Sequence, residues 1–278
     1  GPFTFGPDGN PMIGPVPGMR NYWVAVGVMA GFCQGGGVGL SLAEWMIDGE
    51  PSIDVWAMDV ARFGEFATPD WGTVKSTENY ERRFVMTFPN ETLPKGRVQK
   101  TTALHDRLVA KGARMDQSFG LEHALWFANS PEDAHEDPSF ERNRSHAYVG
   151  REVAAVRNAV GGIEIANFAK HAFKGAGARA YLNHILAGHI PQPGRLSLTP
   201  MLTPKGRLYG DLTIACLAED HFMLVGSGSM QEAHRRWFEA SLPGNVAYSN
   251  VSDLWHGIAL SGPKSRDLLA RICRDDVS

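Results

Sequence analysis

Residues 206–238 read GRLYGDLTIACLAEDHFMLVGSGSMQEAHRRWF. Residues 208–217 and 222–225 are short segments rich in strand-forming side chains, and a turn at 218–220 lies between them, which predicts a β-hairpin. Ser229 and Glu232 have the spacing of a capping box, which predicts that a helix begins there. The order strand, turn, strand, helix predicts a fold with mixed α and β structure.

The flanking segments extend this pattern into a unit of residues 129–278. Residues 196–199 predict a further strand, and residues 258–260 another that leads into a helix with Pro263 at its first position. A polar connection occupies 129–144. Four valines at helical spacing then predict one apolar helix face: Val149, Val153, Val156 and Val160. This third unit is predicted to be α+β.

Two further units precede it. In residues 1–64, a turn at 7–11 leads to a predicted buried strand at 22–26, a glycine-rich loop at 31–39 and a helix that ends at Gly49. This first unit is predicted to be α/β. In residues 65–128, a strand is predicted at 84–88 and a helix at 102–111. The expected domains are therefore 1–64, 65–128 and 129–278.

Composition excludes several classes of protein. The chain has 278 residues, 43% hydrophobic and 21% charged, which is typical of a folded protein and not of a disordered one. The net charge of −3 gives no excess of positive charge for nucleic acid or an anionic membrane. Cys33, Cys216 and Cys273 lie far apart, so neither a disulfide framework nor a CxxC metal site is predicted. We expect a soluble protein without a membrane span or signal peptide.

The ends of the chain suggest a piece of a longer protein. It begins without methionine, on a turn, and it stops at RICRDDVS directly after an apolar helix pattern. We therefore expect an internal fragment.

The glycine-rich segment 31–39 is the first candidate site. Glycines between a strand and a helix let a flat ligand approach the backbone, and the helix N-terminus favours negative charge, as on a reduced flavin. The segment matches neither GxGxxG nor a phosphate-binding loop. The alternative is a tight turn between strand and helix without a ligand.

Asp211 is the second candidate. Alternation places Tyr209, Asp211 and Thr213 on one face of the predicted strand, and Leu212 and Ile214 on the other. Aspartate is depleted inside strands, so its presence there asks for a reason. The alternative is that this face is simply exposed to solvent.

The histidines point to no metal site. His184 and His189 are five residues apart, and no HExxH motif occurs. His105 beside Asp106 is interpreted as a surface pair, with an oriented base as the alternative. Glu122 with His123 is interpreted as core packing, with a pocket as the alternative.

Across three modules the sequence resembles dimethylglycine and sarcosine dehydrogenases. Residues 1–27 and 31–64, GFCQGGGVGLSLAEWMIDGEPSIDVWAMDVARFG, resemble the end of their flavin domain. ENYERRFVMTFPNE at 78–91, 96–115 and GLEHALWFA at 120–128 resemble their linking domain. Residues 206–238 and GIALSGPKSRDLLARI at 257–272 resemble their folate domain, which has the aminomethyltransferase (glycine-cleavage T-protein) fold.

The resemblance implies FAD and tetrahydrofolate as cofactors. An N-methyl amine such as dimethylglycine or sarcosine would be oxidised, and its one-carbon unit would pass to tetrahydrofolate. Asp211 would be catalytic and take up a proton at the folate nitrogens. Leu202, Thr203 and, with weaker support, residues 225–227 would line the pterin pocket. The flavin ring would contact Gly31, Phe32, Cys33, Gln34, Gly35 and Gly36.

The resemblance also implies partners and a location. An electron-transfer flavoprotein would accept electrons in a dehydrogenase, and the location would be the cytoplasm or, in a eukaryote, the mitochondrial matrix. Because the nucleotide-binding GxGxxG is not in this sequence, we expect this chain alone to be colourless and inactive. The alternatives are a free-standing aminomethyltransferase or folate-binding protein with a degenerate flavin segment, and a non-enzymatic interaction module.

Overall fold

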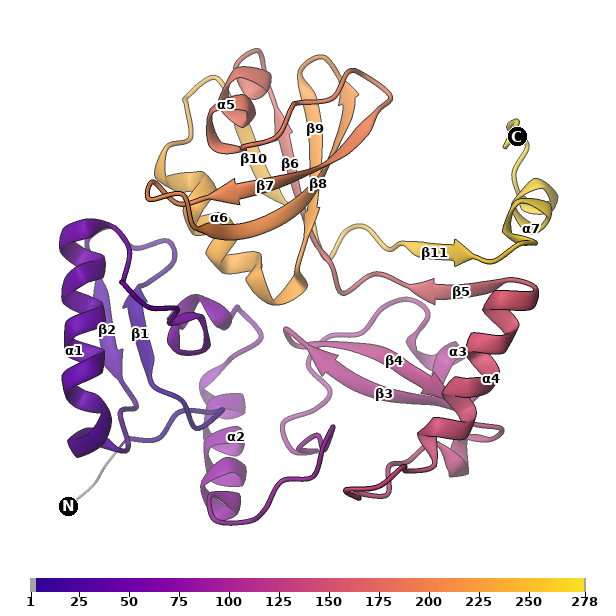
Figure 1. Ribbon diagram of the computed structural model, residues 1–278, viewed down its shortest axis with the longest axis horizontal. Coiled ribbons are helices and arrows are strands. Elements are labelled where there is room, and N and C mark those ends of the chain that lie inside the picture. The colour runs from indigo at the N-terminus through magenta and orange to yellow at the C-terminus, as the bar shows by residue number, and fades with distance from the viewer. Residues whose placement is uncertain (1–3, 278) are drawn as a thin grey trace. The chain divides into compact units, whose positions relative to one another are not determined.

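The computed structural model describes residues 4–277, which form two compact units (Figure 1). The first unit combines the described residues up to Phe84 with Phe168–Leu254. The second combines Val85–Asn167 with the described residues from Trp255 onward. Residues 1–3 and 278, which end the expected first and third domains, lie outside the described residues. The domain boundaries at 64/65 and 128/129 stay a prediction.

An antiparallel sheet forms the core of the first unit. Its strand order is β10-β6-β9-β8-β7. The predicted hairpin is confirmed, because Thr213 pairs with Val225 and Cys216 with Phe222. The strands are β6 Ala169–Lys174, β7 Leu196–Leu202, β8 Leu208–Ala218, β9 His221–Gly226 and β10 Ala247–Asn250.

Two helices complete this core, α5 Ala178–Ile185 and α6 Gln231–Ala240. Phe173, Leu212, Ile214 and Phe238 are all fully buried in one cluster. Leu212 and Ile214 are buried while Asp211 is exposed, so the predicted alternation along β8 is confirmed. The sheet is therefore apolar on the face that α5 and α6 cover.

The prediction of a capping box at Ser229 and Glu232 is wrong. A 3-10 turn, Gly228–Met230, precedes α6, and Met230 occupies the N-cap position without a side-chain hydrogen bond. The Ser229 hydroxyl instead contacts the Ser227 hydroxyl at 3.1 Å. The extra turn moves the start of the helix past Ser229, so this serine has no free helical N–H to accept from.

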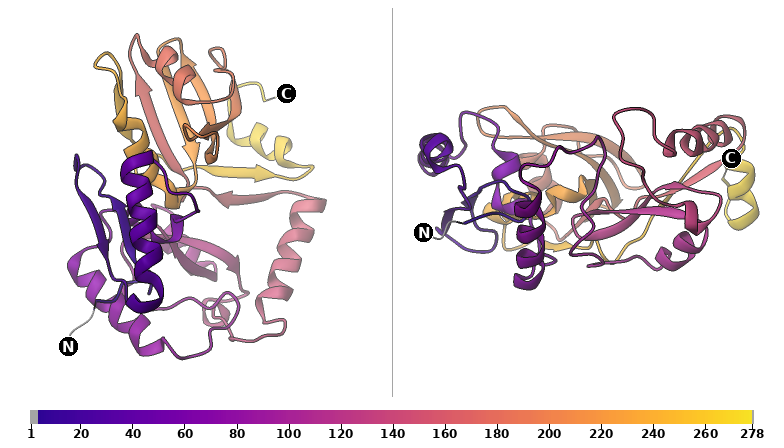
Figure 2. Two further views of the ribbon diagram at one scale, coloured as in Figure 1. Left: turned by 60° about the vertical axis from the view of Figure 1, so that its left-hand side comes forward. Right: turned by 90° about the horizontal axis from the view of Figure 1, so that it is seen from below.

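The N-terminal part of the first unit carries a long helix on a small hairpin. Figures 1 and 2 show α1 alongside β1 and β2. The elements are β1 Met12–Pro15, β2 Trp23–Val26, α1 Gly31–Asp48, α2 Pro69–Arg82 and two 3-10 turns, Trp56–Met58 and Val60–Arg62. The predicted strand at 22–26 forms, but it is only half-buried. The predicted loop at 31–39 is wrong, since helix α1 begins at Gly31.

The second unit holds two two-stranded sheets. β3 pairs with β4, and β5 pairs with β11, both antiparallel. Its elements are α3 His105–Ala110, β3 Ala113–Ser118, β4 Leu121–Phe127, a 3-10 turn Pro131–Asp133, α4 Ser145–Asn158, β5 Gly161–Glu164, β11 Ile258–Ser261 and α7 Ser265–Ile272. Helix α7 begins two residues after Pro263 rather than at it.

Two predictions in this region are corrected. Residues 84–88 form no strand and pair with no other strand among the described residues, because β-forming side chains need a neighbouring strand to pack against. Helix α4 forms, but Val149 and Val153 are 40% and 47% exposed, so the valine face is not a buried one.

Candidate functional site

A cavity of about 690 Å³ lies in the first unit. It brings together three residues singled out from the sequence, Thr203, Asp211 and Ser227. Its wall comes from two stretches far apart in the chain, one from Trp45 to Asp59 and the other around β8 and α6. Further lining side chains include Glu50, Trp56, Tyr209, His234, Arg236 and Trp237. Aromatic surface with a few polar groups is typical of a small-molecule site.

The edge of the sheet presents Asp211 to this cavity. Asp211 lies opposite Pro200 on β7, the last strand of the sheet, where a proline is tolerated because one side of the strand needs no ladder hydrogen bond. Thr203 follows β7, and its hydroxyl accepts a hydrogen bond from the Arg207 N–H at 3.2 Å, which closes the turn between β7 and β8. Leu202 ends β7 and is not among the lining residues.

A buried ion pair joins the two stretches of the wall. The Arg236 guanidinium donates to both carboxylate oxygens of Asp59, at 2.9 and 2.6 Å, and to the Pro15 carbonyl at 2.9 Å. It also donates to the Tyr209 hydroxyl at 3.4 Å and lies over the Trp45 ring. Burial opposes the charge of Arg236, yet the hydrogen bonds and charge of Asp59 outweigh it and raise the pKa of Arg236. A bidentate arginine–carboxylate pair fixes geometry as well as charge.

Two buried histidines lie side by side, and one of them, His234, is part of the cavity wall. His234 on α6 is 1% exposed and lines the cavity, and His171 on β6 is fully buried beside it, with 5.7 Å between the ring centres. His171 Nδ1 lies 3.0 Å from the Tyr248 hydroxyl. Burial lowers the pKa of His171 to about 3 and that of His234 to about 4, and the charge of Asp211 partly offsets the effect on His234. Both imidazoles are therefore neutral at pH 7.

Glu50 is a buried acid in the same wall. It is 7% exposed, and neither carboxylate oxygen has a hydrogen-bond partner among residues 4–277. The nearest cation is Arg207, whose Nε lies 3.6 Å from Glu50 Oε1. Arg207 itself donates to the Pro51 carbonyl at 2.8 Å. Glu50 is therefore a buried carboxylate of the cavity wall that the described residues leave without a hydrogen-bond donor.

The six predicted flavin contacts lie elsewhere. Gly31, Phe32, Cys33, Gln34, Gly35 and Gly36 form the first turns of α1, all six are exposed, and none lines the cavity. A Cβ added at Gly31, Gly35 or Gly36 would meet open space. These residues alone do not form a cradle for a flavin ring, so contact with FAD at these positions stays a prediction.

Sequence reasoning missed His234, Glu50 and the pair of Asp59 with Arg236. His234 lies in a helix that also carries Trp237 and Phe238, and this spacing is typical of an ordinary amphipathic helix, so it does not single out His234. The only local signal was the face of β8, which places Tyr209 beside Asp211.

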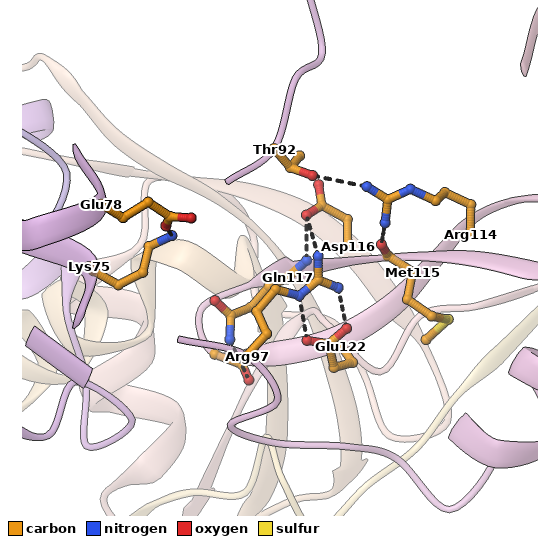
Figure 3. Close-up of polar contacts among 10 residues, drawn as sticks. Lys75, Glu78, Thr92, Arg97, Arg114, Met115, Asp116, Gln117 and Glu122 are labelled. Atoms are coloured by element: carbon orange, nitrogen blue, oxygen red, sulfur yellow. Dashed lines mark hydrogen bonds and ion pairs between the residues drawn. The ribbon is translucent and has the colours of Figure 1, made fainter. Parts of the chain in front are cut away.

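The second unit has its own buried charges (Figure 3). Arg97 forms ion pairs with Glu122 and, at 3.6 Å, with Asp116. These partners raise the pKa of Arg97 against its burial. A second cavity, of about 330 Å³, is lined by Arg97, His105, Arg114 and Glu122. Glu122 is thus the partner of a partly buried arginine, and His105 contacts Asp106 at 2.9 Å as the sequence suggested.

Neither a metal centre nor a membrane-spanning helix is found among residues 4–277. No group of three or more histidine, cysteine, aspartate or glutamate side chains there is arranged to hold a metal ion. No helix in that part of the chain has the length and apolar character needed to cross a membrane.

The first unit is a mixed α/β fold with an aromatic-lined cavity, and the exposed Asp211 is one of the residues that line it. Residues 104–278, more than half of the chain, match the GCVT N-terminal domain family, and the chain belongs to that family. Residues 48–102 match the FAD dependent oxidoreductase central domain. These two matches confirm the predicted resemblance and fold class.

Curated relatives share this arrangement. The chain is 35% identical over 283 residues to dimethylglycine dehydrogenase, mitochondrial, of Mus musculus and of Homo sapiens, which covers all of this chain and 32% of each relative. It is 30% identical over 281 residues to a 4-methylaminobutanoate oxidase (formaldehyde-forming) of Paenarthrobacter nicotinovorans, covering all of this chain and 34% of that enzyme. The chain therefore spans about a third of the length of these relatives.

A solved structure agrees on the fold. The glycine cleavage system aminomethyltransferase T from Bartonella henselae superposes with a TM-score of 0.51 at 20% identity, covering 62% of this chain and 43% of that one.

Proposed function

We propose that this chain supplies the tetrahydrofolate site of an FAD-dependent enzyme that oxidises N-methyl amines of the dimethylglycine and sarcosine type. The relatives that match it end to end carry the names of such oxidoreductases. Its own sequence combines an FAD dependent oxidoreductase central domain with a GCVT N-terminal domain. In this proposal the substrate is a small N-methyl amine, and an electron-transfer flavoprotein accepts the electrons.

One observation carries the proposal. The family resemblance implies a catalytic role at folate for Asp211 and a place along the pterin pocket for Thr203 and Ser227, and all three line one cavity of about 690 Å³. The cavity also holds unpartnered polar atoms on buried side chains, His234 and Glu50. Buried polar atoms are costly unless a partner satisfies them, so the residues present fit a ligand rich in N–H and C=O groups.

The residues suggest a division of roles. Tetrahydrofolate, when bound, supplies the nitrogens that accept the one-carbon unit. Asp211 is exposed on β8 and faces the cavity, where a carboxylate takes up a proton as general base. Arg236 and Asp59 hold the wall in place by their bidentate pair, and the rings of Trp45 and Trp237 supply apolar surface.

For location, the mammalian relatives carry the word mitochondrial in their names, and we extend a mitochondrial matrix location to this protein if its source is a eukaryote. In any other source the expected location is the cytoplasm.

Folate binding to this chain tests the proposal. Trp45, Trp56 and Trp237 line the cavity, so tryptophan fluorescence reports a ligand that enters it. We expect saturable quenching by 5-formyltetrahydrofolate, and weaker binding by about tenfold in Asp211→Asn, because a hydrogen bond to a charged group is lost. Asp220→Asn, on the exposed turn after β8, is the matched control and should bind as the wild type does.

Absence of saturable binding in the wild-type chain would refute the folate assignment. The oxidoreductase part is tested separately on the natural gene product in a denaturing gel. A flavin-fluorescent band much heavier than 30.4 kDa supports a covalent flavoenzyme. A dark band near 30.4 kDa would favour a free-standing folate-binding protein or aminomethyltransferase instead.

A further inference from the structure

His234 is buried in an unusual way. Its side chain is 1% exposed and lines the cavity, yet neither Nδ1 nor Nε2 has a hydrogen-bond partner among residues 4–277. Most buried polar side-chain atoms in proteins are hydrogen-bonded, so each exception needs an explanation. A polar ring that is left unsatisfied in the wall of a pocket is placed where a ligand can satisfy it.

Two glycines make room for this ring. A Cβ on Gly210 would come within 2.8 Å of His234 Nε2, and a Cβ on Gly226 within 3.2 Å of His234 Cε1. Such distances are shorter than ordinary carbon contacts, so side chains at these two positions would displace the imidazole. Asp211 follows Gly210 and Ser227 follows Gly226, and both line the cavity. The ring is thus held in a slot beside the residues already assigned to the site.

The described residues around His234 give neither of its ring nitrogens a hydrogen-bond partner. His171 packs against it with 5.7 Å between ring centres, but His171 Nδ1 is already placed at 3.0 Å from the Tyr248 hydroxyl. The Tyr209 ring centre lies 6.4 Å away, and the Tyr209 hydroxyl contacts the Ala233 carbonyl and Arg236. Because His234 is neutral at pH 7, it carries one N–H donor and one acceptor nitrogen.

We propose that His234 is a ligand-contacting residue of this cavity, which exchanges a hydrogen bond with an N–H or C=O group of a heterocyclic ring bound beside Asp211. The inference rests on the proposed folate site and adds a residue to it. A neutral donor and acceptor next to a carboxylate matches the edge of a heterocycle in which N–H and C=O groups alternate, such as a reduced pterin.

Two substitutions separate this role from simple packing. His234→Gln keeps a donor and an acceptor, whereas His234→Leu keeps the volume and removes both. We expect 5-formyltetrahydrofolate to bind His234→Leu about fivefold to tenfold more weakly than the wild type, as the loss of one hydrogen bond gives. His234→Gln should stay within about threefold. His171→Phe is the matched control, since His171 is equally buried but does not line the cavity, and its affinity should be unchanged.

A measurement on the wild-type chain keeps the inference testable if a variant fails to fold. With ¹⁵N-labelled histidine, addition of 5-formyltetrahydrofolate should move the ring-nitrogen resonances of His234 and leave those of His171 in place. Unchanged His234 resonances, or wild-type affinity in His234→Leu, would overturn the role of His234 while leaving the folate site standing. If the wild-type chain does not bind this folate at all, the proposed site and this inference both fall.

Discussion

Acid should destabilise the first unit through its two buried histidines. Burial lowers the pKa of His171 to about 3 and that of His234 to about 4, whereas an unfolded histidine titrates near about 6.5. Between these values the unfolded chain binds a proton at each histidine and the native chain does not. The stability that the neutral histidines allow is therefore full above about pH 6.5 and falls as the pH is lowered toward 4.

The size of the effect follows from the titration interval. For each histidine, the free energy of unfolding falls by about 1.4 kcal/mol for every pH unit below about 6.5, until the native group is protonated as well. From pH 7 to pH 5 this amounts to about 2 kcal/mol for each residue, or about 4 kcal/mol for His171 and His234 together. No reduction for solvent screening applies, because the two side chains are 0% and 1% exposed.

This loss of unfolding free energy is measured by urea unfolding at pH 7, 6 and 5. The wild type is compared with the double variant His171→Phe/His234→Leu. Carboxylates also titrate in this range, so the quantity of interest is the loss in the wild type minus the loss in the double variant, which should be about 4 kcal/mol. Each single variant should account for about half of it. His135→Gln, a change on an exposed side chain, should keep the full wild-type dependence. Equal losses in the wild type and the double variant would refute the assignment of neutral, buried imidazoles.

Three further changes probe the packing around the cavity. Arg236→Leu should lower the free energy of unfolding by about 3–5 kcal/mol, because it leaves the buried Asp59 unpaired, and adding Asp59→Leu should restore most of it in urea denaturation. Gly210→Ala should cost about 1–3 kcal/mol through its contact with His234, and His234→Ala in the same chain should relieve that cost; strictly additive thermal shifts would contradict the slot. Leu212→Ala should cost about 2–5 kcal/mol, and a loss much below that range would contradict its place in the core.

The sheet was predictable because its pattern is local. Leu212, Ile214 and Cys216 alternate with Asp211 and Thr213, and a period of two over a whole strand specifies which face is buried. The position of Asp211 on the exposed face followed from this alternation alone. Its neighbours in the cavity, Thr203 and Ser227, came from family resemblance.

Helix α1 shows where local signals fail. Gly35, Gly36 and Gly37 lie within it, and each glycine in a helix costs about 1 kcal/mol relative to alanine, so propensity favours a loop there. The helix is held by packing instead, since the buried Val38 and the partly buried Trp45 join the cluster around Ile13 on β1. That cluster depends on Ile13, which lies 25 residues before Val38 and outside the window in which helix propensity is summed.

The cavity could not be predicted from the sequence either, because it also depends on contacts between residues far apart in the chain. Asp59 and Arg236 are 177 residues apart in sequence, and neither has a local pattern that names the other as its partner. Asp59 belongs to the region that matches the FAD dependent oxidoreductase central domain, and Arg236 to the region that matches the GCVT N-terminal domain.

The cavity wall combines residues of the GCVT region with residues that precede it in the chain. Asp211 and His234 come from the GCVT region, whereas Glu50, Trp45 and Trp56 come from residues that precede it. The GCVT region therefore does not enclose the cavity by itself in this protein. A ligand bound beside Asp211, as proposed above, would also contact a wall held in place by Asp59, so its binding and the docking of that wall would stabilise each other. Weakening the pair of Asp59 with Arg236 should then lower ligand affinity, even though Arg236 donates its hydrogen bonds to protein atoms.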